Sequence, residues 1–189
     1  MKKSMCIILC LLMIVPISFC LAGCKSREEG LSNEQSYETK EMVAMRDNVV
    51  KCINSKDKNG LRKLFSKSAQ SEIESIDNKI DELINLCGDN KIIYVHSDTP
   101  GSSGSTTIQP LSITGEFIFK LSNGKQYVGW ISFCDKDNEN KENVGLKTIE
   151  ICNGSKEELP KDFIWDGISS GNSGIFIQDR EERRVGKEC

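Results

Sequence analysis

The sequence lacks an excess of basic residues. It has 25 Lys and Arg against 28 Asp and Glu, which gives a formal net charge of −3. Proteins that bind nucleic acid neutralise phosphates with clustered Lys and Arg, and no such basic patch occurs along this chain. We therefore expect no nucleic-acid partner.

Motifs for metal, phosphate or nucleophilic chemistry are also missing. No two cysteines form a C-x-x-C pair, and those after residue 50 are widely spaced, so a zinc site is not expected. The Gly-Ser stretch 101–105 lacks the Lys-Ser/Thr ending of a P-loop and is not G-x-S-x-G. The sequence therefore favours a protein that is not an enzyme, and it predicts no cofactor and no metal.

The N-terminus has the parts of a bacterial lipoprotein signal. Lys2 and Lys3 precede an apolar run that is shorter than the ~20 residues of a membrane span. The run ends in Leu-Ala-Gly-Cys at 21–24, where the thiol of Cys24 would accept a diacylglyceryl group. Two acyl chains make a stable anchor. We expect a lipid-anchored protein on the extracytoplasmic face of the cell membrane, whose partner is the membrane itself.

This interpretation divides the chain into four parts. Residues 1–23 are the predicted signal peptide, 24–36 a polar flexible tether, and 37–179 a single domain. Residues 181–189 can be back-translated into a widely used sequencing adapter, and we exclude them from the fold.

Four cysteines remain in the predicted domain: Cys52, Cys87, Cys134 and Cys152. An extracytoplasmic location permits disulfides, for which Cys52–Cys87 and Cys134–Cys152 are the natural pairs. The alternative is four buried free thiols that pack as small apolar residues. The sequence leaves both open.

Apolar residues recur at helical spacing in the first half of the domain. The pattern predicts helices over 34–55, around 61–65 with Asp57 as N-cap, and over 68–87, ended by Gly88. After Gly88 the period changes to two. We predict strands at 92–96, 113–121, 125–134, 145–152 and 174–177.

Turns separate the predicted strands. Asn123-Gly124 indicates a two-residue hairpin with positive φ at both positions. The charged loop 135–143 has Asp, Asn and Glu at alternate positions but lacks the glycine and terminal Glu of a calcium loop. We interpret it as a solvated hairpin tip.

Helices followed by an antiparallel meander predict an α+β fold, with N-terminal helices packed on a curved antiparallel sheet. This order resembles the nuclear-transport-factor-two-like, or cystatin-like, cone. The chain more specifically resembles a family of bacterial lipoproteins that carries a domain of unknown function. The resemblance lies in four segments: Asp57–Ser66, Gly101–Gly104, Val144–Ile149 and Gly174–Ile177. It implies a fold, a membrane location and a single-membrane bacterium, and it carries no functional residues.

Tyr94, His96 and Asp98 are the candidate catalytic residues. Strand alternation puts all three on one face. Ketosteroid-isomerase-like members of the resembled superfamily use tyrosine and aspartate inside the cone, where one can stabilise an oxyanion and the other can move a proton. The alternative, which we favour, is a strand end that faces water.

Aromatic residues cluster on the predicted central hairpin. Phe117, Tyr127 and Trp130 are the candidate ligand-binding residues, because an open cone with aromatic walls would bind an apolar or ring-bearing ligand. The alternative, again favoured, is that these side chains fill the core. The sequence thus predicts a module that binds a small ligand or a surface protein. A ketosteroid-isomerase-like enzyme and a structural or immunity-type envelope protein are the alternatives.

Overall fold

The computed structural model describes residues 31–160 and 163–178. The expected signal peptide, Cys24, most of the tether and the C-terminal tail lie outside these residues. The chain forms two units, Met1–Tyr37 and Glu38–Cys189. In the first unit, residues 31–37 are helical. Everything below concerns the second unit. Within the described ranges, no helix combines the length and the apolar character that crossing a membrane requires.

The second unit begins with helices. Residues 38–55 are helical, followed by α2 (Lys58–Leu64), α3 (Lys67–Glu72) and α4 (Ile76–Leu86). Side-chain caps start two of them. The Asp57 carboxylate accepts a hydrogen bond from Gly60 N at 2.8 Å, and Ser66 Oγ accepts from Ala69 N at 3.1 Å. The predicted N-cap at Asp57 is confirmed.

The predicted single helix over 68–87 is wrong. It is divided into α3 and α4, because Ser75 adopts the left-handed conformation with φ of 54°. Ala69 of α3 is buried, as are Ile76, Ile80, Leu83 and Ile84 of α4, so the apolar positions on both sides of the break still face inward. Gly88 follows α4 with φ of +57°, as the sequence predicts.

Six strands form one curved sheet: β1 (Ile92–Ser97), β2 (Gly101–Ser103), β3 (Leu111–Leu121), β4 (Gln126–Lys136), β5 (Gly145–Asn153) and β6 (Gly174–Gln178). The order is β1-β3-β4-β5-β6, with β2 paired to β3. The short 3₁₀ helices η1 (Lys141–Asn143) and η2 (Lys156–Glu158) and the helix α5 (Asp166–Ser170) lie between the later strands. The predicted α+β class is confirmed.

The structure corrects three details of the predicted sheet. The sheet is mixed, because β6 runs parallel to β5. A parallel neighbour requires a crossover, which here is the segment 154–173. Part of the Gly-Ser stretch 101–105, which lies outside the predicted strands, forms strand β2. In the β3–β4 turn only Gly124 has a positive φ, +86°, and Leu121 N donates to Lys125 O, so the loop is wider than two residues.

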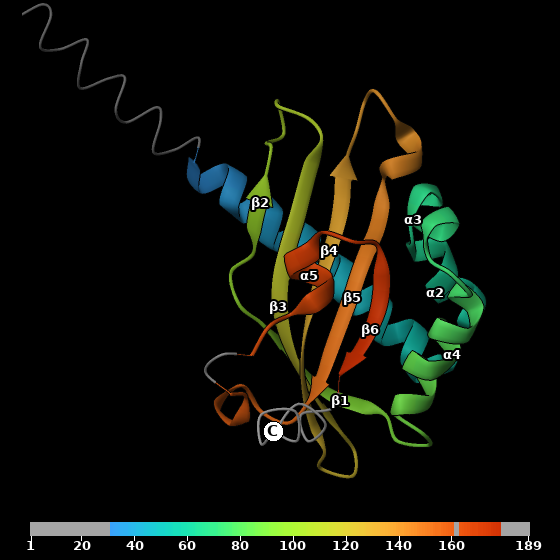
Figure 1. The fold of residues 1–189 in the computed structure, drawn as a ribbon. Helices are drawn as coiled ribbons and strands as arrows, with labels where there is room; N and C mark the ends of the chain where they lie inside the picture. Colours follow the sequence, from blue (N-terminus) through green and yellow to red (C-terminus); the bar gives the residue numbers. More distant parts are fainter. Residues whose placement is uncertain (1–30, 161–162, 179–189) are drawn as a thin grey trace, which may run out of the picture. The chain divides into compact units, whose positions relative to one another are not determined.

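Different segments of the chain pack on the two faces of the sheet. One face, called the core face here, carries Ile113, Phe117, Phe119, Ile131 and Ile149, all buried. The helix of residues 38–55 packs on it, since a Cβ on Gly115 would lie 2.7 Å from Met42 Cε. The segment after β5, with α5, crosses the opposite face. In Figure 1 that N-terminal helix passes behind the sheet and α5 lies in front of it.

Candidate functional site

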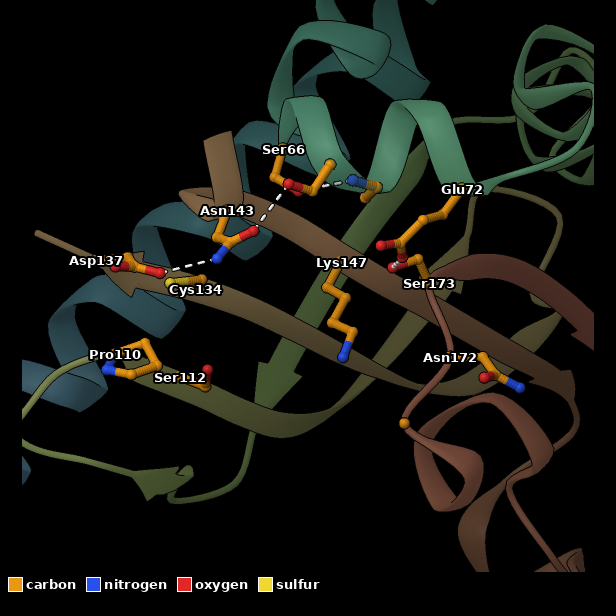
Figure 2. Close-up of a pocket in the computed structure, with 13 residues that line it drawn as sticks. Ser66, Glu72, Pro110, Ser112, Cys134, Asp137, Asn143, Lys147, Asn172 and Ser173 are labelled. Carbon is orange, nitrogen blue, oxygen red and sulfur yellow. Dashed lines mark hydrogen bonds between the residues drawn. The ribbon is translucent and has the colours of Figure 1, made fainter. Parts of the chain in front are cut away.

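A polar cavity of about 310 Å³ lies at the N-terminal end of β5. Its lining comes from α3, the start of β3, the end of β4, η1, β5 and the turn between α5 and β6. The lining residues are Ser66, Ser68, Ala69, Glu72, Pro110, Ser112, Cys134, Asp137, Asn143, Lys147, Gly171, Asn172 and Ser173. Figure 2 shows how the polar side chains surround the open space.

The close approach of α3 to β5 forms one side of the cavity. Ser66 N donates to Leu146 O at 2.9 Å, which joins the start of the helix to the strand. Gly145 permits this approach, since its φ is +128° and a Cβ there would lie 2.8 Å from Leu64 O. An irregularity in the β4–β5 register follows between Ser132 and Phe133. Lys147 falls in that irregular stretch, beside the cavity.

The loop after β4 forms a hydrogen-bonded wall. Asp137 accepts hydrogen bonds from Glu139 N at 3.0 Å, from Asn140 N at 2.8 Å and from Asn143 Nδ2 at 2.9 Å. Ser68 Oγ donates to Asn143 Oδ1 at 2.8 Å and connects this wall to α3. The bond from Asn140 N and that from Asn143 lower the pKa of the Asp137 carboxyl, so it stays ionised.

The solvated hairpin tip expected from the sequence is confirmed for residues 138–142, which are exposed, but not for Asp137. Asp137 is only 4% exposed. Its carboxylate organises the loop internally, in the manner of an Asx turn. Composition alone does not separate that arrangement from a solvated charged loop.

The opposite wall joins α3 to the entry of β6. Ser173 Oγ donates to Glu72 Oε2 at 2.6 Å, and Thr148 Oγ1 donates to Asn172 O at 2.7 Å. These bonds fix the turn that precedes β6 against both α3 and β5. The side chain of Asn172 is exposed at this rim.

Lys147 is the cationic residue of the lining. Its side chain is exposed and extends into the open space between the two walls (Figure 2). Within the described residues, its ammonium group makes no ion pair or hydrogen bond. An ammonium group has three donors, which here face the cavity. The cavity can therefore offer a charge-assisted hydrogen bond to an acceptor that enters it.

A second, smaller cavity of about 150 Å³ lies on the other side of Cys134. Residues 41–48 of the N-terminal helix and the ends of β4 and β5 line it. It has half the volume of the first cavity, and its described lining contains no lysine or arginine. The larger cavity is therefore the better candidate for a site.

The candidate catalytic residues share one face, but they lie outside both cavities. Tyr94 is 55% exposed. His96 Nε2 is 3.6 Å from Asp98 Oδ1, and both side chains are more than half exposed. Lys156 Nζ is 3.2 Å from Asp98 Oδ2. The structure thus places this trio on an open surface, where Asp98 is paired with Lys156, and not in the interior of a cone.

The candidate ligand-binding aromatics do not line either cavity. Phe117 and Tyr127 are buried on the core face, where Phe119 stacks between them with ring centroids 5.8 Å and 5.0 Å away. Trp130 faces the other way and meets Trp165 edge to face at 6.4 Å. Phe117 and Tyr127 fill the core, which is the alternative that the sequence favoured.

The four cysteines of the domain are free thiols in the structure, with Cys52 half-buried and the others buried. The sheet register separates the predicted pair Cys134–Cys152. Cys134 is opposite Gly145 and Cys152 is opposite Val128, at the two ends of the β4–β5 ladder. Six positions along a strand span about 20 Å, whereas a disulfide joins Cα atoms about 6 Å apart. That pairing is wrong.

Sequence reasoning missed the residues that form the cavity, above all Glu72, Ser112, Lys147 and Asn172. Each is an ordinary polar residue at a helix end, on a strand or in a turn. The one local signal is at 146–148, where Leu-Lys-Thr interrupts the alternation of strand β5. It indicates an irregular strand, and it does not indicate which segments meet there.

The chain matches a family described as Domain of unknown function (DUF5104) over residues 48–155, and it belongs to this family. The matched range includes the cavity residues from α3, β3, β4, η1 and β5. The turn at 171–173, which closes the cavity, follows the matched range. A comparison with functionally curated proteins found no match.

Proposed function

We propose that this DUF5104 protein is a lipoprotein, anchored through Cys24 at the extracytoplasmic face of a bacterial membrane, whose domain binds a small polar ligand. The observation that carries the binding function is the polar cavity into which Lys147 extends. Binding pockets for small molecules typically begin at about 300 Å³. At about 310 Å³, this cavity suits a ligand of modest size.

The hydrogen bonds of the walls support the binding function. The Asp137 loop and the Glu72–Ser173 contact hold the two sides of the cavity with bonds of 2.6–3.0 Å. A site that is rigid before binding loses less conformational entropy when the ligand enters. The Lys147 ammonium is left available to that ligand.

The anchoring function is supported by the sequence of residues 1–24. A positive start, an apolar run and a Leu-Ala-Gly-Cys ending precede the polar segment that leads to the domain. Metabolic labelling with a palmitate analogue in a bacterial host tests it. The full chain should take up the label and sediment with membranes, and Cys24→Ala should do neither. Equal labelling of both chains would contradict the anchor.

We also propose that the domain is a relative of the nuclear-transport-factor-two-like, or cystatin-like, cone. Helices that precede a long, curved β3–β4 hairpin and cover one of its faces support this relationship. An experimental structure tests it through the order of the strands. A strand order other than β1-β3-β4-β5-β6 would contradict the proposal.

Native mass spectrometry tests the binding function. The full chain, produced in a bacterium and released from mild detergent, should carry an additional small mass that is lost on denaturation. Lys147→Met should lose that mass, while Lys125→Met, at an exposed position in the β3–β4 turn, should keep it. Retention of the mass by Lys147→Met would place binding elsewhere.

A further inference from the structure

We propose that the cavity takes a small zwitterion of amino-acid or dipeptide size, with its carboxylate on Lys147 and its ammonium group on Glu72. This inference rests on the proposed binding function and specifies the chemical class of the ligand. Some polar groups of the lining are already hydrogen-bonded within the protein, and others are available to a ligand.

Lys147 is available to an acceptor on the ligand. No carboxylate among the described residues lies within ion-pairing distance of its ammonium group, although Glu72 and Asp137 both line the same cavity. An ammonium group pairs best with a carboxylate or a comparable anionic oxygen. The part of the ligand that reaches Lys147 is therefore an anionic oxygen group.

Asp137 is less available to a ligand than Glu72 is, because three hydrogen bonds already hold it in its own loop. Its Oδ1 accepts two backbone N–H groups and its Oδ2 accepts the Asn143 carboxamide. The residue is also nearly buried in its own loop. Its negative charge contributes to the electrostatic potential of the cavity, while its oxygens accept hydrogen bonds from the loop that forms the wall.

Glu72 is the carboxylate of the lining that can accept further hydrogen bonds. Ser173 Oγ donates to its Oε2, and Oε1 has no hydrogen-bond partner among the described residues. The carboxylate is exposed at the rim and cannot move freely because the Ser173 bond holds it (Figure 2). It is placed to accept hydrogen bonds from a ligand ammonium group.

The charge balance of the lining favours a zwitterion over a simple anion. Glu72 and Asp137 contribute two negative charges and Lys147 contributes one positive charge. A ligand with only negative charge meets Lys147 but is repelled by both carboxylates. A neutral molecule with separated charges satisfies Lys147 and Glu72 together.

The remaining groups of the lining suit the polar centre of such a molecule. Ser112 and Asn172 supply a hydroxyl and a carboxamide from opposite sides of the cavity (Figure 2). A carboxamide both donates and accepts, as a peptide group does. The volume of about 310 Å³ limits the ligand to about the size of one or two residues.

The test uses the full chain in mild detergent and two sets of probes: the common amino acids and alanyl-alanine. Saturation-transfer NMR identifies the strongest binder, and calorimetry then compares it with its N-acetylated and C-amidated forms. We expect each blocked form to bind at least about ten-fold more weakly, because each loses one charged pair.

Two substitutions assign the two ends of the ligand. Lys147→Gln should weaken the parent compound at least about ten-fold and leave the C-amidated form unchanged within about two-fold. Glu72→Gln should also weaken the parent compound at least about ten-fold, and it should leave binding of the N-acetylated form unchanged within about two-fold. Lys67→Gln and Glu74→Gln are matched controls, because both residues are exposed near α3 and neither lines the cavity. A circular dichroism spectrum of each variant checks folding.

The outcomes separate this inference from the proposed function. Equal binding of parent and blocked forms, or equal binding by the variants and the controls, overturns the zwitterion assignment. Failure of every probe, with a different mass retained in the native spectrum, overturns the assignment but leaves the binding function in place. Failure of every probe with no retained mass overturns both.

Discussion

The Nζ atom of Lys156 lies 2.8 Å from Oε1 of Glu116 and joins η2 to the middle of β3. The same ammonium lies 3.2 Å from Asp98 Oδ2. Glu116 is 9% exposed, so Lys156 is the cation that compensates a nearly buried carboxylate. This contact holds the segment that follows β5 against the sheet.

Replacement of Lys156 by Gln should destabilise the domain. Glu116 would keep its charge at a nearly buried position without a cation, at a cost of about 1–2 kcal/mol in the free energy of unfolding. Urea unfolding measures that cost. The double variant Lys156→Gln/Glu116→Gln should recover part of it, because no buried charge remains. A double variant less stable than Lys156→Gln would contradict this account.

The Lys156 contribution should depend on pH. Hydrogen bonds to Glu116 and then to Asp98 raise the pKa of Lys156 above its ordinary value of 10.5. The stabilisation is therefore fully present below pH 10.5 and is lost as the pH rises through the higher pKa of the folded state. The difference in stability between wild type and Lys156→Gln should be constant near neutral pH and shrink in strong alkali. A difference that grows with pH would contradict the ion pair.

Cys87 should also make the fold sensitive to alkali, and this effect should begin at a lower pH than the effect of Lys156. Burial raises the pKa of the Cys87 thiol from 9.0 to about 11. The unfolded chain therefore releases this proton first, and stability falls as the pH rises from 9.0 to about 11. A difference of two pKa units corresponds to a loss of at most about 3 kcal/mol. Cys87→Ala should be less stable than wild type at pH 7 but should lose less stability over this alkaline range. Parallel pH profiles would show that the thiol does not cause the loss.

The thiols of the domain should be accessible to alkylation after unfolding without a reductant. We expect iodoacetamide to modify Cys52, Cys87, Cys134 and Cys152, as measured by peptide mass spectrometry. In the folded protein Cys52 should react first, because it is half-buried and the other three are buried. Burial raises the pKa of Cys52 as well, so even this reaction should be slow at neutral pH. A peptide in which Cys52 is linked to Cys87 would contradict the free-thiol state.

Gly129 should not tolerate a side chain. It is opposite Phe117 in the β3–β4 register, and a Cβ there would lie 2.9 Å from Phe117 Cζ and 2.7 Å from Glu150 O. Gly129→Ala should lower the free energy of unfolding by about 1–3 kcal/mol, because the aromatic ring has to move within a packed core. Gly101→Ala is the control, since a Cβ at that position would meet no atom of the described residues within 4 Å. Similar melting temperatures for the two variants would contradict this packing.

Local pattern was a good guide where one element decides its own structure. The apolar residues Ile76, Ile80, Leu83 and Ile84 recur at helical spacing, and all four side chains are buried in α4. Tyr127 and Trp130 are three positions apart on β4, so strand alternation puts them on opposite faces, where the structure has them. Both patterns follow from the geometry of a single segment.

Local pattern failed at two positions where the backbone or the hydrogen bonds of the loop depart from what the residue types indicate. Ser75 lies in a continuous helical stripe, yet it takes a left-handed conformation that divides the helix. Asp137 belongs to a charged loop whose composition predicts solvation, yet three hydrogen bonds hold it in a nearly buried position. Polar residues of the same kinds surround both positions, so the sequence did not show that Ser75 breaks the helix or that Asp137 is nearly buried.

The sequence by itself determined the α+β class, the positions of most helices and strands, and the separation of core and exposed faces. These properties depend on the 3.6-residue period of helices and the two-residue period of strands. Both periods can be recognised within a short stretch of sequence. Only the tertiary structure decided that β6 joins the sheet in parallel and that Cys134 and Cys152 lie at opposite ends of a ladder. It alone also formed the cavity, because Glu72, Lys147 and Ser173 lie on three segments that are brought together only by packing and register.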